Sequence, residues 1–325
     1  MAEPRLIAAI DTPPESPART RPSRREAFRV GLVQERWHPD PAEHEAALAT
    51  GIRLAARTGA RLVCLQELTL SPYFAIVADG LDAAREHAEG VPDGPTTAFA
   101  RRMAAESGVH VHASLYERRA KDPDGLGYNT AICVAPDGEL VARTRKLHIP
   151  VTAGYYEDRY FRPGPPGDEA FPVVAVGDAQ LGFPTCWDQW FPELARAYSL
   201  AGAEVIVYPT AIGSEPDHPG FDTEPLWERV ITGNGIANAT FMVAVNRFGS
   251  EPPLHFYGSS FISDPYGRVL AQAPRDEPAV LVADLDLDQR RDWLELFPFL
   301  TTRRPDAYAA LVKPGEREGA AAPEA

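Results

Sequence analysis

The stretch LGFPTCWDQWFPELAR (181–196) joins an apolar segment to an amphipathic one through a single cysteine, Cys186. The residues before Cys186 are typical of a buried strand, and Pro192 with Glu193 is typical of the first turn of a helix. A cysteine that only fills a core does not need two tryptophans, an Asp and a Gln directly after it. The stretch therefore predicts a strand-to-helix turn that presents a thiol to a ligand.

Helical and strand-like segments alternate on both sides of this turn. Asp40 before Pro41 is a helix-starting pair, and PDG at 136–138 predicts a hairpin. Alternation of this kind predicts an α/β protein in which helices cover the outer faces of mixed sheets. Helices are expected at 40–60, 95–108, from 192 and at 223–239, and strands at 28–34, 61–67, 109–117, 128–136, 139–146, 171–176, 181–186, 203–210, 240–247, 258–273 and 279–286.

The 325-residue chain has neither an internal repeat nor a low-complexity linker inside 28–312. We therefore expect a single domain over 28–312, a size that layered α/β enzymes reach. Residues 1–27 contain only the short apolar piece LIAAI among prolines and arginines, and a disordered tail is expected there. Residues 313–325 predict a flexible C-terminal tail for the same reason.

The composition argues against several classes of protein. A formal net charge of −14 leaves no excess of basic residues to neutralise phosphates, so we expect no nucleic-acid or membrane partner. No apolar run reaches the roughly 18 residues of a membrane helix, and the N-terminus lacks a signal-peptide core. Three scattered cysteines suggest neither a disulfide framework nor a metal motif. The expectation is a cytoplasmic protein with reduced thiols and no metal.

Three predicted strands end in residues that suit acyl transfer. Glu67, Lys146 and Cys186 each end an apolar strand pattern, and ligands bind beyond the carboxyl ends of strands in open α/β sheets. A thiol needs a base, which Glu67 offers, and a positive neighbour, which Lys146 offers. The backbone N–H of Trp187 is expected to be a second donor to the oxyanion.

Each of these residues also has a structural interpretation. Cys64 and Cys133 lie inside apolar strands and are expected to be core residues, because a free cysteine behaves as a small hydrophobe. Taken singly, residues such as Glu67 and Lys146 are most often solvated strand ends, and Cys186 is as readily another core thiol. The spacing alone leaves this choice open.

Four motifs in order resemble the nitrilase superfamily of carbon–nitrogen hydrolases. They are LVCLQEL around Glu67, RTRKLHIP around Lys146, YYEDRYFRPG around Glu157 and TCWDQWFPELAR around Cys186. The resemblance covers 28–312 and implies a four-layer α-β-β-α sandwich. It also implies catalysis by Glu67, Lys146 and Cys186 with Glu157 beside them, no cofactor, and assembly into a homo-oligomer, a dimer or higher.

Further segments resemble the branch of that family that acts on N-carbamoylputrescine: YPTAIGSEP (208–216), NRFG (246–249), FYGSSFI (256–262) and RRPDAY (303–308). The resemblance implies a cysteine-dependent amidohydrolase that forms a thioester on Cys186 and releases putrescine, carbon dioxide and ammonia, a step of polyamine biosynthesis. A general aliphatic amidase, a nitrilase and a non-catalytic binding protein remain as alternatives.

The substrate is expected to be small and neutral or cationic, because no arginine lies beside the nucleophile in CWDQW. A cationic tail requires a carboxylate and an aromatic wall. The segments at 151–156 and 232–240 depart from the usual sequence of the branch, so they leave the expected reaction unchanged and the choice of substrate open. The expected substrate-binding residues are Asp188, Trp190, Glu215 and Tyr73, with Asp217 as a further candidate.

Overall fold

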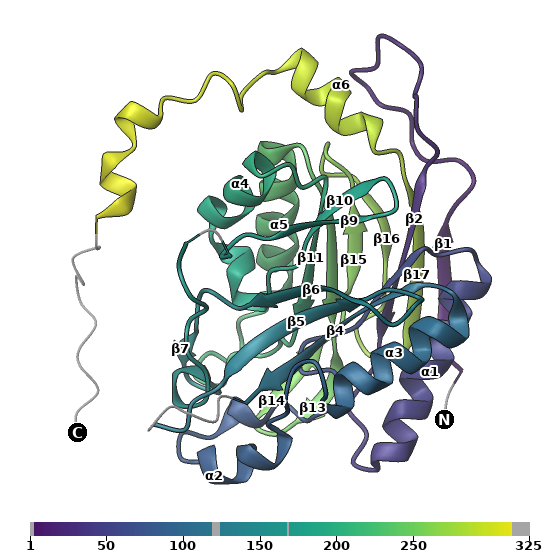
Figure 1. The fold of residues 1–325 in the computed structure, drawn as a ribbon. Coiled ribbons are helices and arrows are strands. Elements are labelled where there is room, and N and C mark those ends of the chain that lie inside the picture. The colour runs from purple at the N-terminus through teal and green to yellow at the C-terminus, as the bar shows by residue number, and fades with distance from the viewer. Residues whose placement is uncertain (1–2, 119–123, 168, 314–325) are drawn as a thin grey trace.

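Two β-sheets stack face to face, and helices cover both outer faces (Figure 1), which confirms the predicted four-layer α-β-β-α sandwich. The computed structural model describes residues 3–118, 124–167 and 169–313. The seven-stranded sheet has the order β1 (Arg5–Ala9), β17 (Ala279–Leu285), β2 (Phe28–Gln34), β3 (Leu62–Cys64), β4 (His110–Glu117), β5 (Tyr128–Val134) and β6 (Leu140–Arg145). The six-stranded sheet has the order β16 (Val269–Gln272), β15 (Phe261–Ser263), β12 (Phe241–Asn246), β11 (Val205–Thr210), β10 (Ala179–Gly182) and β9 (Val173–Val176).

Each sheet contains three neighbouring parallel strands, β2–β3–β4 in one and β10–β11–β12 in the other. Antiparallel strands flank both groups. The parallel strands within a sheet bring their carboxyl ends to the same edge, so the segments that follow neighbouring strands begin close together.

Four helices cover the sheets, α1 (Pro41–Arg57) and α3 (Pro95–Ser107) on the seven-stranded sheet and α4 (Pro192–Leu200) and α5 (Glu224–Asn238) on the six-stranded one. The first begins as predicted, since the Asp40 carboxylate accepts hydrogen bonds from the N–H groups of Ala42 and Glu43. Two further helices are α2 (Leu81–Ala84) and α6 (Asp288–Leu296). Two short hairpins are β7 (Val151–Thr152) with β8 (Tyr155–Tyr156) and β13 (Phe248–Glu251) with β14 (Leu254–Tyr257).

Apolar layers between these elements hold the sandwich together. Successive residues of a strand point to opposite faces. In β2, Val30 and Leu32 therefore enter the layer between the two sheets, whereas Val33 packs in the layer beneath α1 and α3. A third layer joins α4 and α5 to the six-stranded sheet.

The N-terminal segment differs from the predicted disordered tail at 1–27. Arg5–Ala9 form β1, which runs parallel to β17 at the edge of the seven-stranded sheet. Ile7 and Ala9 pack against the core between the sheets. The apolar piece noted in the sequence therefore has a partner strand, and burial against that core offsets the entropy of ordering it.

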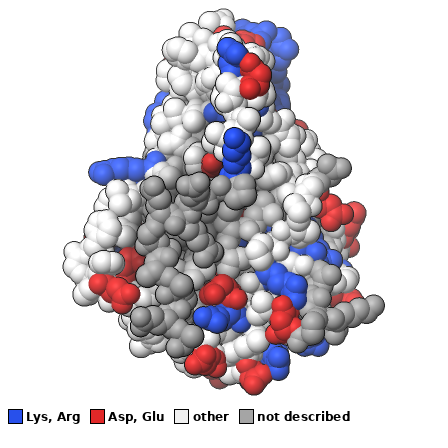
Figure 2. All heavy atoms as spheres, turned by 90° about the vertical axis from the view of Figure 1, so that its left-hand side faces the viewer, with Lys and Arg blue, Asp and Glu red and all other residues white. Residues whose placement is uncertain are grey.

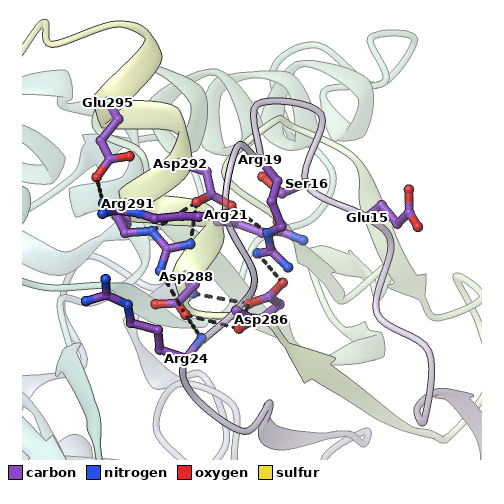
Figure 3. Close-up of polar contacts among 12 residues, drawn as sticks. Glu15, Ser16, Arg19, Arg21, Arg24, Asp286, Asp288, Arg291, Asp292 and Glu295 are labelled. Carbon is purple, nitrogen blue, oxygen red and sulfur yellow. Dashed lines mark hydrogen bonds and ion pairs between the residues drawn. The ribbon is translucent and has the colours of Figure 1, made fainter.

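Residues after β1 continue to α6, where ion pairs hold them (Figure 3). Arg19 lies 2.6 Å from Asp286 and 2.9 Å from Asp292. The Ser23 hydroxyl contacts the carboxylates of Asp286 and Asp288. The prediction of disorder was wrong here because Asp286 and Asp292, the acidic partners of Arg19, lie near the other end of the sequence.

The C-terminal segment leaves the sandwich after α6 and runs away from it as an arm, shown in yellow in Figure 1. It contains 3-10 turns at Pro305–Ala307 and Ala309–Val312. Of the flexible tail predicted at 313–325, only Lys313 is described, and the rest lies outside the described residues.

Acidic and basic side chains lie interspersed on the face of the molecule turned to the viewer in Figure 2. Within the described part of the chain, no helix is both long enough and apolar enough to cross a bilayer.

Candidate active site

The three residues predicted to act together come from both sheets. Glu67 follows β3 and Lys146 follows β6 in the seven-stranded sheet, and Cys186 follows β10 in the six-stranded sheet. The predicted strand at 61–67 is shorter than expected and ends at Cys64, because the chain turns at Leu68, whose φ is +49°. Glu67 and Lys146 are fully buried and Cys186 is 6% exposed.

Cys186 lies at a turn between β10 and a 3-10 helix, Cys186–Trp190, as the sequence predicted. Its φ of +41° is a left-handed conformation that residues other than glycine rarely adopt. Such strained backbone is concentrated at functional sites. The N–H of Trp187 belongs to the first turn of the 3-10 helix, where backbone donors lack an acceptor within the helix.

Lys146 forms ion pairs with two buried carboxylates. Its Nζ lies 3.0 Å from Glu67 Oε1, 2.8 Å from Glu157 Oε1 and 2.7 Å from Glu157 Oε2. Glu157 lies on a 3-10 turn after β8 and is 1% exposed. The structure therefore brings Glu157 to the predicted triad, where burial of the charges is compensated by pairing.

Burial and the neighbouring charges shift the pKa values of these groups. Burial disfavours the ammonium, but the carboxylates of Glu157 and Glu67 outweigh it and raise the pKa of Lys146, which stays charged. Burial raises the pKa of Glu157 to about 7, against the effect of Lys146. Burial and Glu67 also raise the pKa of the Cys186 thiol, although Lys146 lowers it. The thiol is therefore protonated at rest and requires a base.

The Glu67 carboxylate has one occupied oxygen and one free oxygen. Its Oε1 accepts hydrogen bonds from Lys146 Nζ and, at 2.7 Å, from Asn129 Nδ2. Its Oε2 is buried and has no hydrogen-bond partner among the residues that the structure describes. A buried polar atom without a partner is costly. The free Oε2 is thus the oxygen open to the thiol proton.

A cavity of about 330 Å³ opens onto Cys186. Trp187, Trp190 and Glu215 line it, and the last two are expected substrate-binding residues. Burial raises the pKa of Glu215 above its usual range. Asp217, the further candidate, is exposed and does not line this cavity. The other lining residues are Pro150, Thr152, Tyr155, Glu157, Ala211, Ile212, Phe221, Thr223 and Leu226.

Asp188, predicted to bind substrate, lies behind the turn and does not line the cavity. Its Oδ1 accepts the backbone N–H of His148 at 3.0 Å and lies 2.7 Å from His148 Nδ1. Its Oδ2 accepts the N–H of Thr185 at 3.1 Å. Backbone donors thus occupy this carboxylate, which joins the segment after Lys146 to the residue before Cys186.

Tyr73, also predicted to bind substrate, is 1% exposed and does not line the cavity. Its hydroxyl donates a hydrogen bond of 2.8 Å to Glu157 Oε1. The phenol therefore contacts the second glutamate, because a buried tyrosine hydroxyl needs an acceptor. Asp188 and Tyr73 each lie next to a site residue, but their polar groups contact other protein atoms and not the cavity.

Sequence reasoning missed two residues that hold Glu67. Asn129 donates to its carboxylate, and the fully buried Arg247 donates from Nη2 to the carbonyl oxygens of Glu67 at 2.7 Å and Leu68 at 3.1 Å. Arg247 also pairs with Glu251 at 2.7 Å. Two signals in the sequence could have found these residues. Asn129 is a polar residue inside an apolar strand, and Arg247 directly follows an apolar strand. Such polar groups are buried only when they have partners.

Cys64 and Cys133 are fully buried in the layer between the sheets, as predicted. Within the described ranges, no group of three His, Cys, Asp or Glu side chains is arranged to hold a metal ion. A larger hollow of about 1090 Å³, bordered by Trp37 and Phe74, lacks the three predicted catalytic side chains in its wall. The smaller cavity has Cys186 and Glu157 in its wall. Glu67 and Lys146 are not lining residues, but the ion pairs of Lys146 join both of them to Glu157.

The sequence matches the carbon–nitrogen hydrolase family over residues 29–295. The chain belongs to this family, which confirms the family resemblance and the class of enzyme that the motifs indicated.

Three relatives extend this finding. An N-carbamoylputrescine amidase of Arabidopsis thaliana is 37% identical over 301 residues, covering 89% of this chain and 96% of the relative. A citrullinase of Francisella tularensis is 36% identical over 296 residues, covering 88% of this chain and 98% of the relative. The crystal structure of a carbon–nitrogen hydrolase from Helicobacter pylori G27 is similar with a TM-score of 0.77 and 33% identity, covering 88% of this chain and 98% of that one.

Proposed function

We propose that this protein is an N-carbamoylputrescine amidohydrolase, which hydrolyses its substrate to putrescine, carbon dioxide and ammonia through a thioester on Cys186. The observation that carries the proposal is that one cavity has both Cys186 and Glu215 in its wall, with no Arg or Lys among the lining residues. The substrate has a ureido group at one end and an ammonium at the other. A thiol and a carboxylate in one cavity are complementary to these two groups.

The first half-reaction begins with a proton transfer. Glu67 Oε2 takes the Sγ proton of Cys186, and the thiolate attacks the ureido carbon. The N–H of Trp187 donates to the oxyanion that forms, and the charge of Lys146 stabilises it. The ammonium of Lys146 already faces acceptors on Glu67 and Glu157. Lys146 therefore stabilises the oxyanion through its positive charge. A direct hydrogen bond to the oxyanion would require one N–H of Lys146 to give up its contact with Glu157.

The intermediate then releases ammonia. The bond from the ureido carbon to its terminal nitrogen breaks, and Glu67 gives that nitrogen the proton it had taken. An N-alkylcarbamoyl thioester remains on Cys186. Glu67 next removes a proton from water, whose oxygen attacks the thioester carbon, and Glu157 helps to position that water. The Cys186 sulfur leaves and regains its proton from Glu67, and the released alkyl carbamate loses carbon dioxide to give putrescine.

The rest of the cavity wall suits the remainder of this substrate. Trp187, Trp190 and Ile212 are lining residues that offer apolar surface to four methylene groups. Glu215 has no side-chain hydrogen-bond or ion-pair partner among the described residues, and it is half-buried. An ammonium placed beside it would gain a charge-assisted hydrogen bond, which is about twice as strong as a neutral one.

The alternative substrates differ in what the cavity must offer them. Citrulline carries the same ureido group but ends in an amino acid, whose carboxylate would need a cation that the cavity wall lacks. A short aliphatic amide or nitrile would use Cys186 without Glu215, so an aliphatic amidase or nitrilase is the second candidate. A binding protein would have no use for the free Oε2 of Glu67 or for the strained Cys186.

The experiment that tests the proposal is ammonia release from five substrates, with Cys186→Ala as control. They are N-carbamoylputrescine, citrulline, N-carbamoyl-β-alanine, a short aliphatic amide and a short nitrile. We expect the highest kcat/KM with N-carbamoylputrescine and no turnover in the control. A higher kcat/KM with another of the five would reject N-carbamoylputrescine as the preferred substrate but would leave the proposed carbon–nitrogen bond hydrolysis standing. No ammonia from any of them, with the protein folded, would reject the enzymatic proposal.

We also propose that the protein is a homo-oligomer of a reducing compartment such as the cytoplasm. The outer side of α5 and the segment after α6 expose apolar side chains, among them Leu226 at 42%, Ile236 at 39% and Phe297 at 53%. Exposed apolar patches of this kind favour association with another surface. All three cysteines are free, which suits reduced thiols. Light scattering after size exclusion tests the assembly, and a monomer at micromolar concentration would contradict it.

A further inference from the structure

The two carboxylate oxygens of Glu67 have different surroundings. Oε1 accepts hydrogen bonds from Asn129 Nδ2 at 2.7 Å and from Lys146 Nζ at 3.0 Å, whereas Oε2 has no partner among the described residues. An amide nitrogen and an ammonium can only donate. A proton that reaches this carboxylate therefore has room only on Oε2, because donors already face Oε1.

A short chain of hydrogen bonds fixes the orientation of the Asn129 amide. The backbone N–H of Leu68, which can only donate, contacts Ser114 Oγ at 3.1 Å. Ser114 Oγ accepts that bond and donates its own proton to Asn129 Oδ1 at 3.3 Å. Because the Glu67 carboxylate can only accept, the nitrogen of the amide faces Glu67 and its oxygen faces Ser114. The chain begins and ends at neighbouring residues, 67 and 68.

The residues of this chain lie on rigid and buried elements. Ser114 belongs to β4 and Asn129 to β5, which are paired strands inside the seven-stranded sheet, and both residues are fully buried. The backbone carbonyl of Asn129 also accepts the N–H of Lys146 at 2.9 Å. Asn129 therefore contacts the two charged residues of the proposed triad from a strand that cannot move easily.

We propose that Ser114 and Asn129 are positioning residues for the hydrolysis, which hold Oε1 of Glu67 in place and reserve Oε2 as the base for Cys186. This inference rests on the proposed function in one respect only, namely that Glu67 is the base. It assigns the two oxygens different tasks, and it explains why a polar pair lies inside two buried strands.

The test is Asn129→Leu, which keeps the size of the side chain and removes the donor. Loss of a hydrogen bond to a carboxylate raises its pKa. We expect the acid limb of the kcat/KM profile to move up by about one pH unit, and kcat at neutral pH to fall by roughly 100-fold because Glu67 loses its orientation. Ser114→Ala removes the donor to Asn129 Oδ1 and leaves the amide less firmly held. It should move the acid limb and kcat in the same directions as Asn129→Leu, by smaller amounts.

Thr130→Val is the matched control. Thr130 follows Asn129 on β5 and is fully buried, and its hydroxyl also contacts a glutamate, Glu117, at 2.8 Å, but away from the cavity. We expect a lower melting temperature and an unmoved pH profile. A pH profile in Asn129→Leu identical to that of the wild type, or the same shift in Thr130→Val, would overturn the proposal. If Asn129→Leu does not fold, the pH profile of Ser114→Ala is compared with those of the wild type and Thr130→Val, and the same two outcomes would overturn the proposal.

A substrate-independent readout separates this inference from the proposed function. Iodoacetamide alkylation of Cys186 requires loss of the thiol proton, and Cys186→Ala identifies background from the buried Cys64 and Cys133. We expect the midpoint of alkylation against pH to move up in Asn129→Leu and to stay in Thr130→Val. If the wild type released no ammonia from any of the five substrates, the proposed function would fail, while this midpoint would still decide on the positioning residues.

Discussion

The residues around the cavity form two regions of opposite character. The reaction region (Glu67, Lys146, Glu157 and Cys186) has its three charged side chains at most 1% exposed and joined by ion pairs. The outer region (Glu215, Phe221 and Leu226) has Phe221 at 55% and Leu226 at 42% exposure, and a carboxylate that lacks a side-chain partner among the described residues.

The difference separates chemistry from substrate choice. In the reaction region every polar group depends on another, so one substitution disturbs several pKa values and contacts at once. In the outer region the side chains depend on few neighbours, so a substitution there changes what binds and leaves proton transfer intact. A family built on this plan can keep one reaction and exchange its substrates.

The largest effect is expected from Glu67→Gln. This change keeps the shape of the side chain but removes the base, so we expect kcat to fall roughly 10⁴-fold or more with every substrate. Steady-state kinetics with the diamine-derived ureide and with a short amide checks this, alongside a melting curve. A folded variant that retained a tenth of its activity would place the base elsewhere.

Asp188→Asn should have the next largest effect. Its carboxylate joins the backbone N–H groups of His148 and Thr185, and the weaker acceptor will let the residues next to Lys146 and Cys186 separate. We expect kcat to fall by roughly 100-fold with all substrates and KM to change little. His148→Ala removes the ring contact with Asp188 and the stacking of that ring on Phe191 but keeps the backbone N–H, so it should cost less. An effect on KM alone would restore Asp188 to a substrate-binding role.

Glu215→Gln should act only on substrates that carry a cation. A hydrogen bond to a charged group contributes about 1.5–3 kcal/mol, so KM for N-carbamoylputrescine should rise by roughly 10- to 100-fold while kinetics with a short amide stay unchanged. Asp217→Asn is the matched control, since Asp217 is an exposed acid outside the cavity wall. Equal losses with both substrates would show that the two regions are not separable.

The smallest effect on activity, but a clear one on stability, is expected from His112→Phe. His112 stacks on Phe183, three residues before Cys186, with ring centres 5.0 Å apart, and burial lowers the pKa of His112 to about 3. An unfolded histidine titrates near pH 6.5, so the unfolded chain binds a proton between roughly pH 6.5 and 3 that the folded chain does not.

The free energy of unfolding therefore falls as the pH drops, by about 1.4 kcal/mol per pH unit for this histidine. Urea unfolding at pH 7, 6 and 5 should show a slope reduced by that amount in His112→Phe. Phe221→Leu, in the outer region, removes no titratable group and should keep the slope of the wild type in this pH range. An unchanged slope in His112→Phe would mean that the imidazole is protonated in the folded state.

Local sequence signals were sufficient for an α/β chain with helices over mixed sheets, and they indicated Glu67, Lys146 and Cys186 as a set. The four-layer sandwich, and the choice of these residues over solvated strand ends and a core thiol, needed the family resemblance. Alternating apolar residues such as Val30 and Leu32 determine which face of a strand is buried, and the Asp40–Pro41 pair begins a helix without help from distant residues. Glu67 follows β3 and Lys146 follows β6 in one sheet, and the stacking of the second sheet on it brings Cys186 to them.

Partners far apart in sequence could not be predicted. Nothing near Arg19 indicates that Asp286 and Asp292 will neutralise it, so the N-terminal segment resembled a disordered tail. Asp188 and Tyr73 were expected in the cavity because they neighbour site residues or suit a ligand. Side-chain direction at a tight turn depends on which N–H groups need an acceptor, and this becomes visible only in three dimensions.

The edge position of β1 has a practical consequence for anyone who trims the chain to the family match at 29–295. Such a protein would lack Arg5–Ala9, and β17, with the sequence AVLVADL, would become the open margin of the seven-stranded sheet. An uncovered apolar strand is a template for unwanted pairing between molecules. Poor yield or aggregation of the trimmed protein would then reflect the missing neighbour strand, and restoring the first 28 residues should prevent it.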